Sequence, residues 1–250
     1  MSIYIKRYLL VWGLVCASMW VGAQTSNEQQ QVSPVAQRQA TLSSRQQAIV
    51  AIGSYTGRGD LEHLSQALVQ GLEAGITVNE IKEVLVQSYA YCGFPRSLRA
   101  IQTFMKVLDE RKQRGIEDVM GKEASDIIAQ GDKYERGAKI LKELSGIDSS
   151  HPKTGYGAFV PTIDRFLKEH LFADIFERGL LSYQDRELAT VSFLAGVGGV
   201  EPMARGHMGI CLHLGITRGQ LAALLDIVAK NLGEGSVESL RGVLKSLSNQ

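Results

Sequence analysis

The stretch that decides the fold is Leu181–Leu225, LSYQDRELATVSFLAGVGGVEPMARGHMGICLHLGITRGQLAALL. Its apolar residues recur at helical spacing, and glycines interrupt the pattern, so the stretch predicts three consecutive helices. Ser182, followed by Asp185 three residues later, is typical of the first position of a helix. Two side chains in the stretch, Glu187 and His207, are able to move protons.

An earlier stretch, Leu42–Leu85, repeats this outline. The sequence Gly-Ile-Thr recurs at 75–77 and 215–217. When the chain is aligned on this match, Gln47 and Ala67 fall opposite the two proton carriers of the later stretch. The sequence therefore predicts one fold written twice, with the acid/base pair kept only in the second copy.

The predicted fold class is all-α, because no segment keeps the strict polar and apolar alternation of a strand. We expect two tandem helical repeats joined by a charged, glycine-punctuated segment. The predicted segments are a signal peptide (1–23), a flexible tether (24–40), a first repeat (41–112), a helical linker or arm (113–160) and a second repeat (161–250).

The N-terminus has the pattern of a cleavable signal peptide. Lys6 and Arg7 precede an apolar run, Tyr8–Val21, and small residues then lead to a cut near Ala23. A membrane anchor is the alternative, but a spanning helix needs about 20 apolar residues and this run is shorter. We expect a periplasmic or secreted protein with no stable membrane insertion after cleavage.

The charge balance argues against nucleic-acid partners. Of the 27 Lys and Arg side chains, Lys6 and Arg7 leave with the signal peptide, so 25 remain against 26 Asp and Glu. A mature chain near neutrality with no basic run lacks the positive field that phosphate backbones require.

Two cysteines remain in the mature chain, Cys92 and Cys211, because Cys16 belongs to the signal peptide. An oxidising compartment permits a disulfide between them, or redox activity. The alternative is that both are small buried apolar side chains.

Glu187 precedes Val191 and Leu194 by four and seven residues, which places it on or beside the apolar stripe of its helix. His207 shares a face with Ile210 and Cys211. Alone, the glutamate could be a first-turn residue favoured by the helix dipole, and the histidine a hydrogen-bonded core residue. Together they suggest a buried acid and imidazole that face one pocket, as general acid/base catalysis requires.

Other site chemistries lack support. His207 and His213 are six residues apart, which does not place both on one helical face, and neither HExxH nor CxxC occurs, so we expect no metal. Motifs of serine hydrolases and nucleotide-binding loops are also missing. Arg205 and Arg96 could each hold a carboxylate, or could be solvated surface charges.

The chain resembles the carboxymuconolactone decarboxylase family in its form with two tandem repeats. The resemblance rests on Ser44–Pro95, which ends in the Y-x-G-x-P motif YCGFP, predicted to be a loop, and on His170–Thr217, which holds the R-E…H…G-I-T pattern. It implies an all-α fold that forms rings, here a homotrimer of two-repeat chains. It also implies decarboxylation of a small carboxylated lactone or related acid without a cofactor, with Glu187 and His207 catalytic and Arg205, Arg96 and Tyr91 binding the substrate.

The same family includes alkylhydroperoxidase-like proteins, which use a CxxC pair with a Glu and a His. This sequence departs from that pattern, since Pro95 stands three residues after Cys92. A thiol-dependent antioxidant using Cys92 and Cys211 is therefore the second hypothesis, and a non-catalytic oligomeric binding protein is the third. Apolar stripes in Leu61–Leu72 and Leu221–Val228 look too wide for one repeat to cover, which also favours an oligomer.

Overall fold

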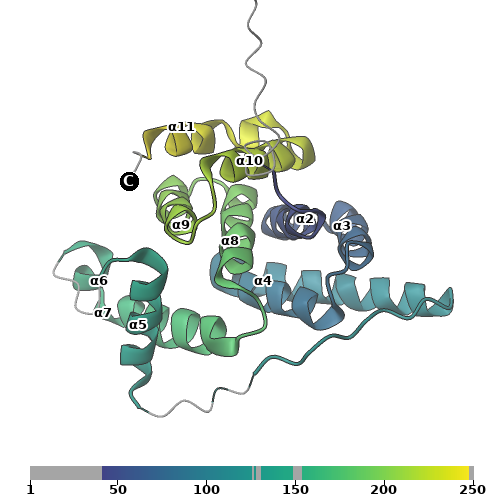
Figure 1. The fold of residues 1–250 in the computed structure, drawn as a ribbon, viewed down its shortest axis with the longest axis horizontal. Coiled ribbons are helices and arrows are strands. Elements are labelled where there is room, and N and C mark those ends of the chain that lie inside the picture. Colours follow the sequence, from purple (N-terminus) through teal and green to yellow (C-terminus); the bar gives the residue numbers. More distant parts are fainter. Residues whose placement is uncertain (1–40, 126, 128–130, 149–153, 248–250) are drawn as a thin grey trace, which may run out of the picture. The chain divides into compact units, whose positions relative to one another are not determined.

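The computed structural model describes residues 41–125, 127, 131–148 and 154–247. The predicted signal peptide and tether lie outside these residues. All regular structure within them is helical, without a strand, which confirms the predicted all-α class (Figure 1). None of their helices is both long enough and apolar enough to cross a membrane.

The stretch Leu181–Leu225 forms the three predicted helices: α8 (Tyr183–Val197), α9 (Glu201–His213) and the first half of α10 (Arg218–Leu232). The hydroxyl of Ser182 accepts a hydrogen bond from the backbone N–H of Asp185 at 3.1 Å and so caps α8, as the sequence predicts.

The earlier stretch forms α2 (Ser44–Arg58), α3 (Leu61–Glu73) and the start of α4 (Val78–Gln113). The Y-x-G-x-P motif is not a loop, which corrects the interpretation of that segment. Gly93 alone is non-helical, with φ +79° and ψ 158°, and α4 continues after this kink. A glycine takes this dihedral pair without the steric penalty of a side chain, so one residue redirects the helix.

The two sets of helices match in detail. The first helix of each set has 15 residues and the second has 13. Thr77 and Thr217 each form a capping box at the third helix, and the glycine two residues earlier has φ near +85° in both sets, +84° and +87°. These shared lengths and caps support the proposal of a tandem repeat.

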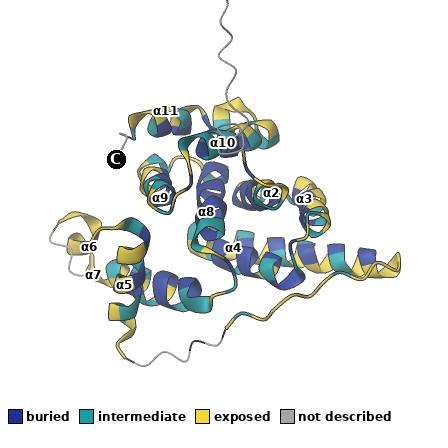
Figure 2. Ribbon diagram, in the orientation of Figure 1, coloured by how far each residue is buried: buried dark blue, intermediate teal, exposed yellow. Residues whose placement is uncertain are grey.

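Helix α8 contacts α2, α4, α9 and α10 (Figure 1), and its residues from Arg186 to Gly196 are all buried (Figure 2). Its crossing with α2 depends on glycines. A Cβ on Gly196 would lie 2.5 Å from the carbonyl oxygen of Ser54, and one on Gly57 would overlap the carbonyl of Phe193. The two backbones therefore touch, which fixes the helix that carries Glu187.

The hydrophobic core joins the two halves. One cluster holds mostly second-half residues but includes Leu42 and Val50, and another holds mostly first-half residues but includes Leu181, Ala189 and Phe193. Each half thus completes the hydrophobic core of the other. The positions of α4, α8 and α9 relative to one another therefore depend on packing between the two halves.

Between Gln113 and Lys133 the described residues form no helix, so the predicted helical arm is helical only in its second part. Gly137 in that part packs on the backbone carbonyl of Lys168, where a Cβ would overlap it. The remaining elements are α5 (Lys133–Ser145), α6 (Gly155–Phe159), α7 (Pro161–Phe166), the π-helix η1 (Leu167–Ile175), the 3₁₀ turns η2 (Phe176–Arg178) and η3 (Glu234–Ser236), and α11 (Glu238–Ser246).

Candidate active site

Glu187 on α8 and His207 on α9 are in direct contact. The His207 Nδ1 and Glu187 Oε2 atoms lie 2.7 Å apart. The glutamate side chain is fully buried, whereas 15% of the histidine side chain is exposed. The two groups touch and only the imidazole is exposed, so a ligand can reach the pair only through the imidazole.

The hydrogen bond fixes the role of each ring nitrogen. An ionised carboxylate only accepts hydrogen bonds, so Nδ1 of His207 donates to Glu187 and Nε2 is left to exchange a proton with a ligand. The other carboxylate oxygen, Oε1 of Glu187, is buried and has no hydrogen-bond partner among the described residues. A buried carboxylate with a free oxygen is costly for folding alone, which indicates a function.

Tyr91, from the first half of the chain, completes this cluster. Its ring stands edge-on to the His207 ring, with centroids 5.3 Å apart, and lies 6.1 Å from the ring of Phe193. Its hydroxyl is buried, and Thr190 is within reach as a hydrogen-bond partner, although the two groups form no bond of good geometry. Burial raises the pKa of the Tyr91 phenol, and the nearby Glu187 carboxylate raises it further. At neutral pH Tyr91 is therefore a hydrogen-bond donor and not a base.

A buried ion pair lies beside the cluster. Arg186 donates to Glu83 Oε1 on α4 at 2.8 Å and to Gln87 Oε1 at 3.0 Å, and all three side chains are almost completely buried. Burial lowers the pKa of the Arg186 guanidinium, and Glu83 opposes this effect. The sequence alone does not predict this pair, because its only signal is one charged residue on the buried face of each of two helices, and the two residues are 103 positions apart.

The two cysteines are free thiols. Burial raises the pKa of Cys92 to about 12, an effect that Arg96 partly offsets. Cys211 is completely buried, and its pKa is raised well above the ordinary value by burial and by Glu187. Both thiols are therefore protonated at neutral pH, whereas the attacking species in thiol chemistry is the thiolate.

The structure does not join the two predicted arginines to the pair. Arg205 donates to the Ser246 hydroxyl at 2.5 Å, on another face of α9. Arg96 lies near Gly59, where an added Cβ would be 3.8 Å from the arginine Nε. Among the described contacts, neither arginine hydrogen bonds to Glu187 or His207.

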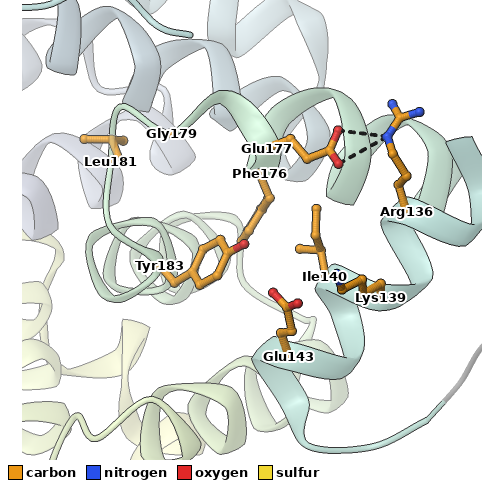
Figure 3. A pocket seen from close by; sticks show the side chains of 9 residues that line it. All are labelled: Arg136, Lys139, Ile140, Glu143, Phe176, Glu177, Gly179, Leu181 and Tyr183. Atoms are coloured by element: carbon orange, nitrogen blue, oxygen red, sulfur yellow. Dashed lines mark hydrogen bonds and ion pairs between the residues drawn. The ribbon is translucent and has the colours of Figure 1, made fainter. Parts of the chain in front are cut away.

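A hollow of about 470 Å³ lies between α5, η2 and the start of α8, and Figure 3 shows the side chains that line it. Tyr183 and Glu143 face it, and an ion pair of 3.2 Å joins Arg136 to Glu177 at its side. Its charges are thus of both signs and partly paired, and it is lined by neither member of the Glu187–His207 pair. No group of three or more His, Cys, Asp or Glu side chains among the described residues could hold a metal ion.

Residues 161–245 match the model of the carboxymuconolactone decarboxylase family. The matched region runs from α7 into α11 and contains both Glu187 and His207. At the level of this family, the match supports a function like that of the carboxymuconolactone decarboxylases or the alkylhydroperoxidases. No curated protein matches the chain significantly.

Proposed function

We propose that the protein is an exported, cofactor-free lyase that decarboxylates a small carboxylated lactone or related acid by general acid/base catalysis. The observation that carries the proposal is the 2.7 Å contact between a fully buried Glu187 and a partly exposed His207. A carboxylate that orients an imidazole and stabilises its protonated form is the arrangement that histidine needs to act as a proton carrier.

The chemistry of such a step suits these groups. Loss of CO₂ breaks a carbon–carbon bond and leaves the electron pair delocalised as a dienolate toward the lactone carbonyl. Protonated His207 then delivers the Nε2 proton to carbon, and the Glu187 carboxylate stabilises the cation before transfer. The neutral Tyr91 phenol is able to donate a hydrogen bond to the developing oxyanion, which is a large contribution in a buried site.

The experiment is direct assay of 4-carboxymuconolactone decarboxylation by the purified protein, followed by CO₂ release and ultraviolet absorbance. We expect turnover without added metal or cofactor, and loss of roughly 10²–10⁴ in rate for His207→Gln. Gln47→Ala, at the matched position of α2, is the control. Absence of turnover with this substrate and a panel of related lactone acids would favour the non-catalytic binding protein.

The thiol-dependent alternative is tested by the double variant Cys92→Ser, Cys211→Ser. Because both thiols have raised pKa values, we expect the variant to retain lyase activity and the parent protein to reduce an alkyl hydroperoxide no faster than free thiol. Peroxide reduction that disappears in the variant would replace the lyase proposal with the antioxidant one.

We further propose a homotrimer, although on a different surface from the one suggested by the sequence. Leu68, Leu224 and Leu225, from the stripes thought too wide, are completely buried within one chain. Exposed apolar residues instead follow the second half of α4 at helical spacing, including Phe94 and Leu98.

Light scattering should give a mass three times that of the chain, and Leu98→Glu with Met105→Glu should lower it. A monomer mass for the parent protein would contradict the trimer.

Export is tested separately. The mature protein recovered from cells should begin at Gln24, as read by mass spectrometry of its N-terminal peptide. Recovery of the intact N-terminus with the cytoplasmic proteins would exclude export while leaving the lyase proposal unaffected.

A further inference from the structure

A groove of about 690 Å³ lies along a face of α9 that does not carry His207. Residues 202, 205, 206, 209 and 213 line it and recur at the three- and four-residue spacing of one helical face. The buried residues Ala204, Met208 and Cys211 lie on the other side of the helix, toward α8. The groove is therefore distinct from the Glu187–His207 cluster.

Two glycines make room for this groove. A Cβ added to Gly206 or Gly209 would meet no described atom within 4 Å. At the matched positions of α3 the chain has Gln66 and Val69, whose side chains stand where α9 has bare backbone. A volume of this size lies in the range of small-molecule sites, about 300–1,000 Å³.

The groove is lined by two cations and no acidic residue. Arg205 and Arg218 are among its lining residues, together with His213, and none of the described lining residues is Asp or Glu. Arg205 donates to a serine hydroxyl and Arg218 to the Leu244 carbonyl, at 2.9 Å, so no carboxylate of the described residues neutralises either guanidinium. The hollow of Figure 3 differs, because its arginine is paired with a glutamate.

The position of Arg218 strengthens the positive potential. It is the first residue of α10, and the first turn of that helix contains no acidic residue. The N-terminal end of a helix carries a partial positive charge, which disfavours a cation there unless an anion is bound nearby. The matched helix α4 has Glu80 in its first turn.

Apart from Ser145 and the two glycines, the rest of the lining is apolar and comes from Ile147, Pro202, Ile210, Leu212 and Leu247. We propose that this groove binds a small organic acid, with its single carboxylate between Arg205 and Arg218 and its apolar body along these side chains. Guanidinium groups bind carboxylates through two parallel hydrogen bonds, and the apolar walls favour such a ligand over an inorganic anion.

The test is calorimetric titration of the full mature protein with sodium octanoate. We expect saturable binding that Arg205→Gln with Arg218→Gln weakens by at least about tenfold, since a hydrogen bond to a charged group contributes that much or more. Gly209→Leu should also weaken binding by filling the groove, and its Cβ has open space. Arg99→Gln, an exposed arginine on α4, is the matched control and should bind like the parent.

Uncharged octanamide and inorganic phosphate should both bind at least about tenfold more weakly than octanoate. Octanamide lacks the carboxylate that the arginines bind, and phosphate lacks the apolar body that packs along the walls. Equal binding of octanamide, or of phosphate, would overturn the proposal, as would an absence of octanoate binding. Octanoate binding that is lost in His207→Gln but kept in Gly209→Leu would place the ligand at the acid/base pair instead. Loss in Gly209→Leu with binding kept in His207→Gln would support the groove whether or not the lyase proposal holds.

Discussion

The two matched regions of the molecule, α2 to α4 and α8 to α10, have the same helical arrangement but different polar side chains. Residues 140 positions apart occupy corresponding places on the paired helices. At each corresponding place in the candidate site only one region has a group for acid/base or ionic chemistry. The second region has Glu187, His207 and Arg186, where the first has Gln47, Ala67 and Gln46. The first region has Tyr91 and Glu83, where the second has Asn231 and Ala223.

This difference separates what folding needs from what function needs. The caps and the positive-φ glycines occur in both regions, and the α2–α8 crossing joins one region to the other. The buried Glu187 and the buried Arg186 occur in one, and buried charge is unfavourable unless paired. The first region packs without such groups at the matched positions, which favours a chemical role for them in the second.

The largest expected change in stability comes from breaking the buried ion pair. Arg186→Met leaves Glu83 buried with Arg178 as its remaining partner, at 2.9 Å, and should lower the free energy of unfolding by about 2–3 kcal/mol, the contribution of a hydrogen bond to a charged group. The matched variant Gln46→Ala loses only an exposed capping contact and should cost about 1 kcal/mol or less. Urea unfolding measures both. Equal effects at the two positions would mean that the ion pair is not the structural difference between the regions.

The next prediction concerns the glycines where α2 and α8 cross. Gly57→Ala and Gly196→Ala should each destabilise the protein by about 1–3 kcal/mol, because each Cβ meets a backbone carbonyl of the partner helix. Gly206→Ala, on the open face of α9, should instead stabilise it by about 0.5–1 kcal/mol. Thermal unfolding gives the stability of the three variants. Stabilities of Gly57→Ala and Gly196→Ala as high as that of Gly206→Ala would contradict the close contact between α2 and α8.

Much of the frame could be predicted from the sequence, because caps and apolar periodicity are local. The Ser182 cap, the all-α class and the three helices of Leu181–Leu225 follow from neighbouring residues. The kink at Gly93 could not be told from a loop, since one glycine dihedral decides between them.

The candidate site was predictable in part. Glu187 and His207 could be identified from their helical faces, but their 2.7 Å contact depends on how α8 and α9 pack. Glu83 and Arg186 come from opposite halves of the chain, and no local pattern relates them. Arg205 is able to bind a carboxylate, yet it lies on a face of α9 that does not carry His207 and lines a groove away from the Glu187–His207 pair.

Removing the Tyr91 hydroxyl should separate activity from stability. Tyr91→Phe removes a buried hydroxyl whose only nearby partner among the described residues is Thr190, without good hydrogen-bond geometry, so the free energy of unfolding should change by about 1 kcal/mol or less. The rate of decarboxylation should fall by about tenfold if the phenol donates to the oxyanion. Tyr55→Phe, in the first region, is the control and should leave the rate unchanged. A rate for Tyr91→Phe equal to that of the parent would remove Tyr91 from the site.

The smallest effect concerns alkaline pH. Because the folded pKa of Cys92 is raised to about 12 from 9.0, the unfolded chain loses this proton first, and stability should fall as pH rises from about 9 to 12. Cys92→Ala should therefore lose about 1 kcal/mol less than the parent between pH 7 and pH 10, by urea unfolding. An identical loss in both proteins would show that the thiol is not shifted.

The central claim is that Glu187 and His207 act as one unit, and a double-mutant cycle on kcat/KM tests it most directly. Glu187→Gln and His207→Gln should each lower kcat/KM by roughly 10²–10⁴, and the double variant should be little worse than either, because groups that act together are not additive. The matched cycle of Gln47→Ala and Ala67→Ser should leave kcat/KM unchanged. Single variants that retain activity, or losses that simply multiply in the double variant, would contradict the claim.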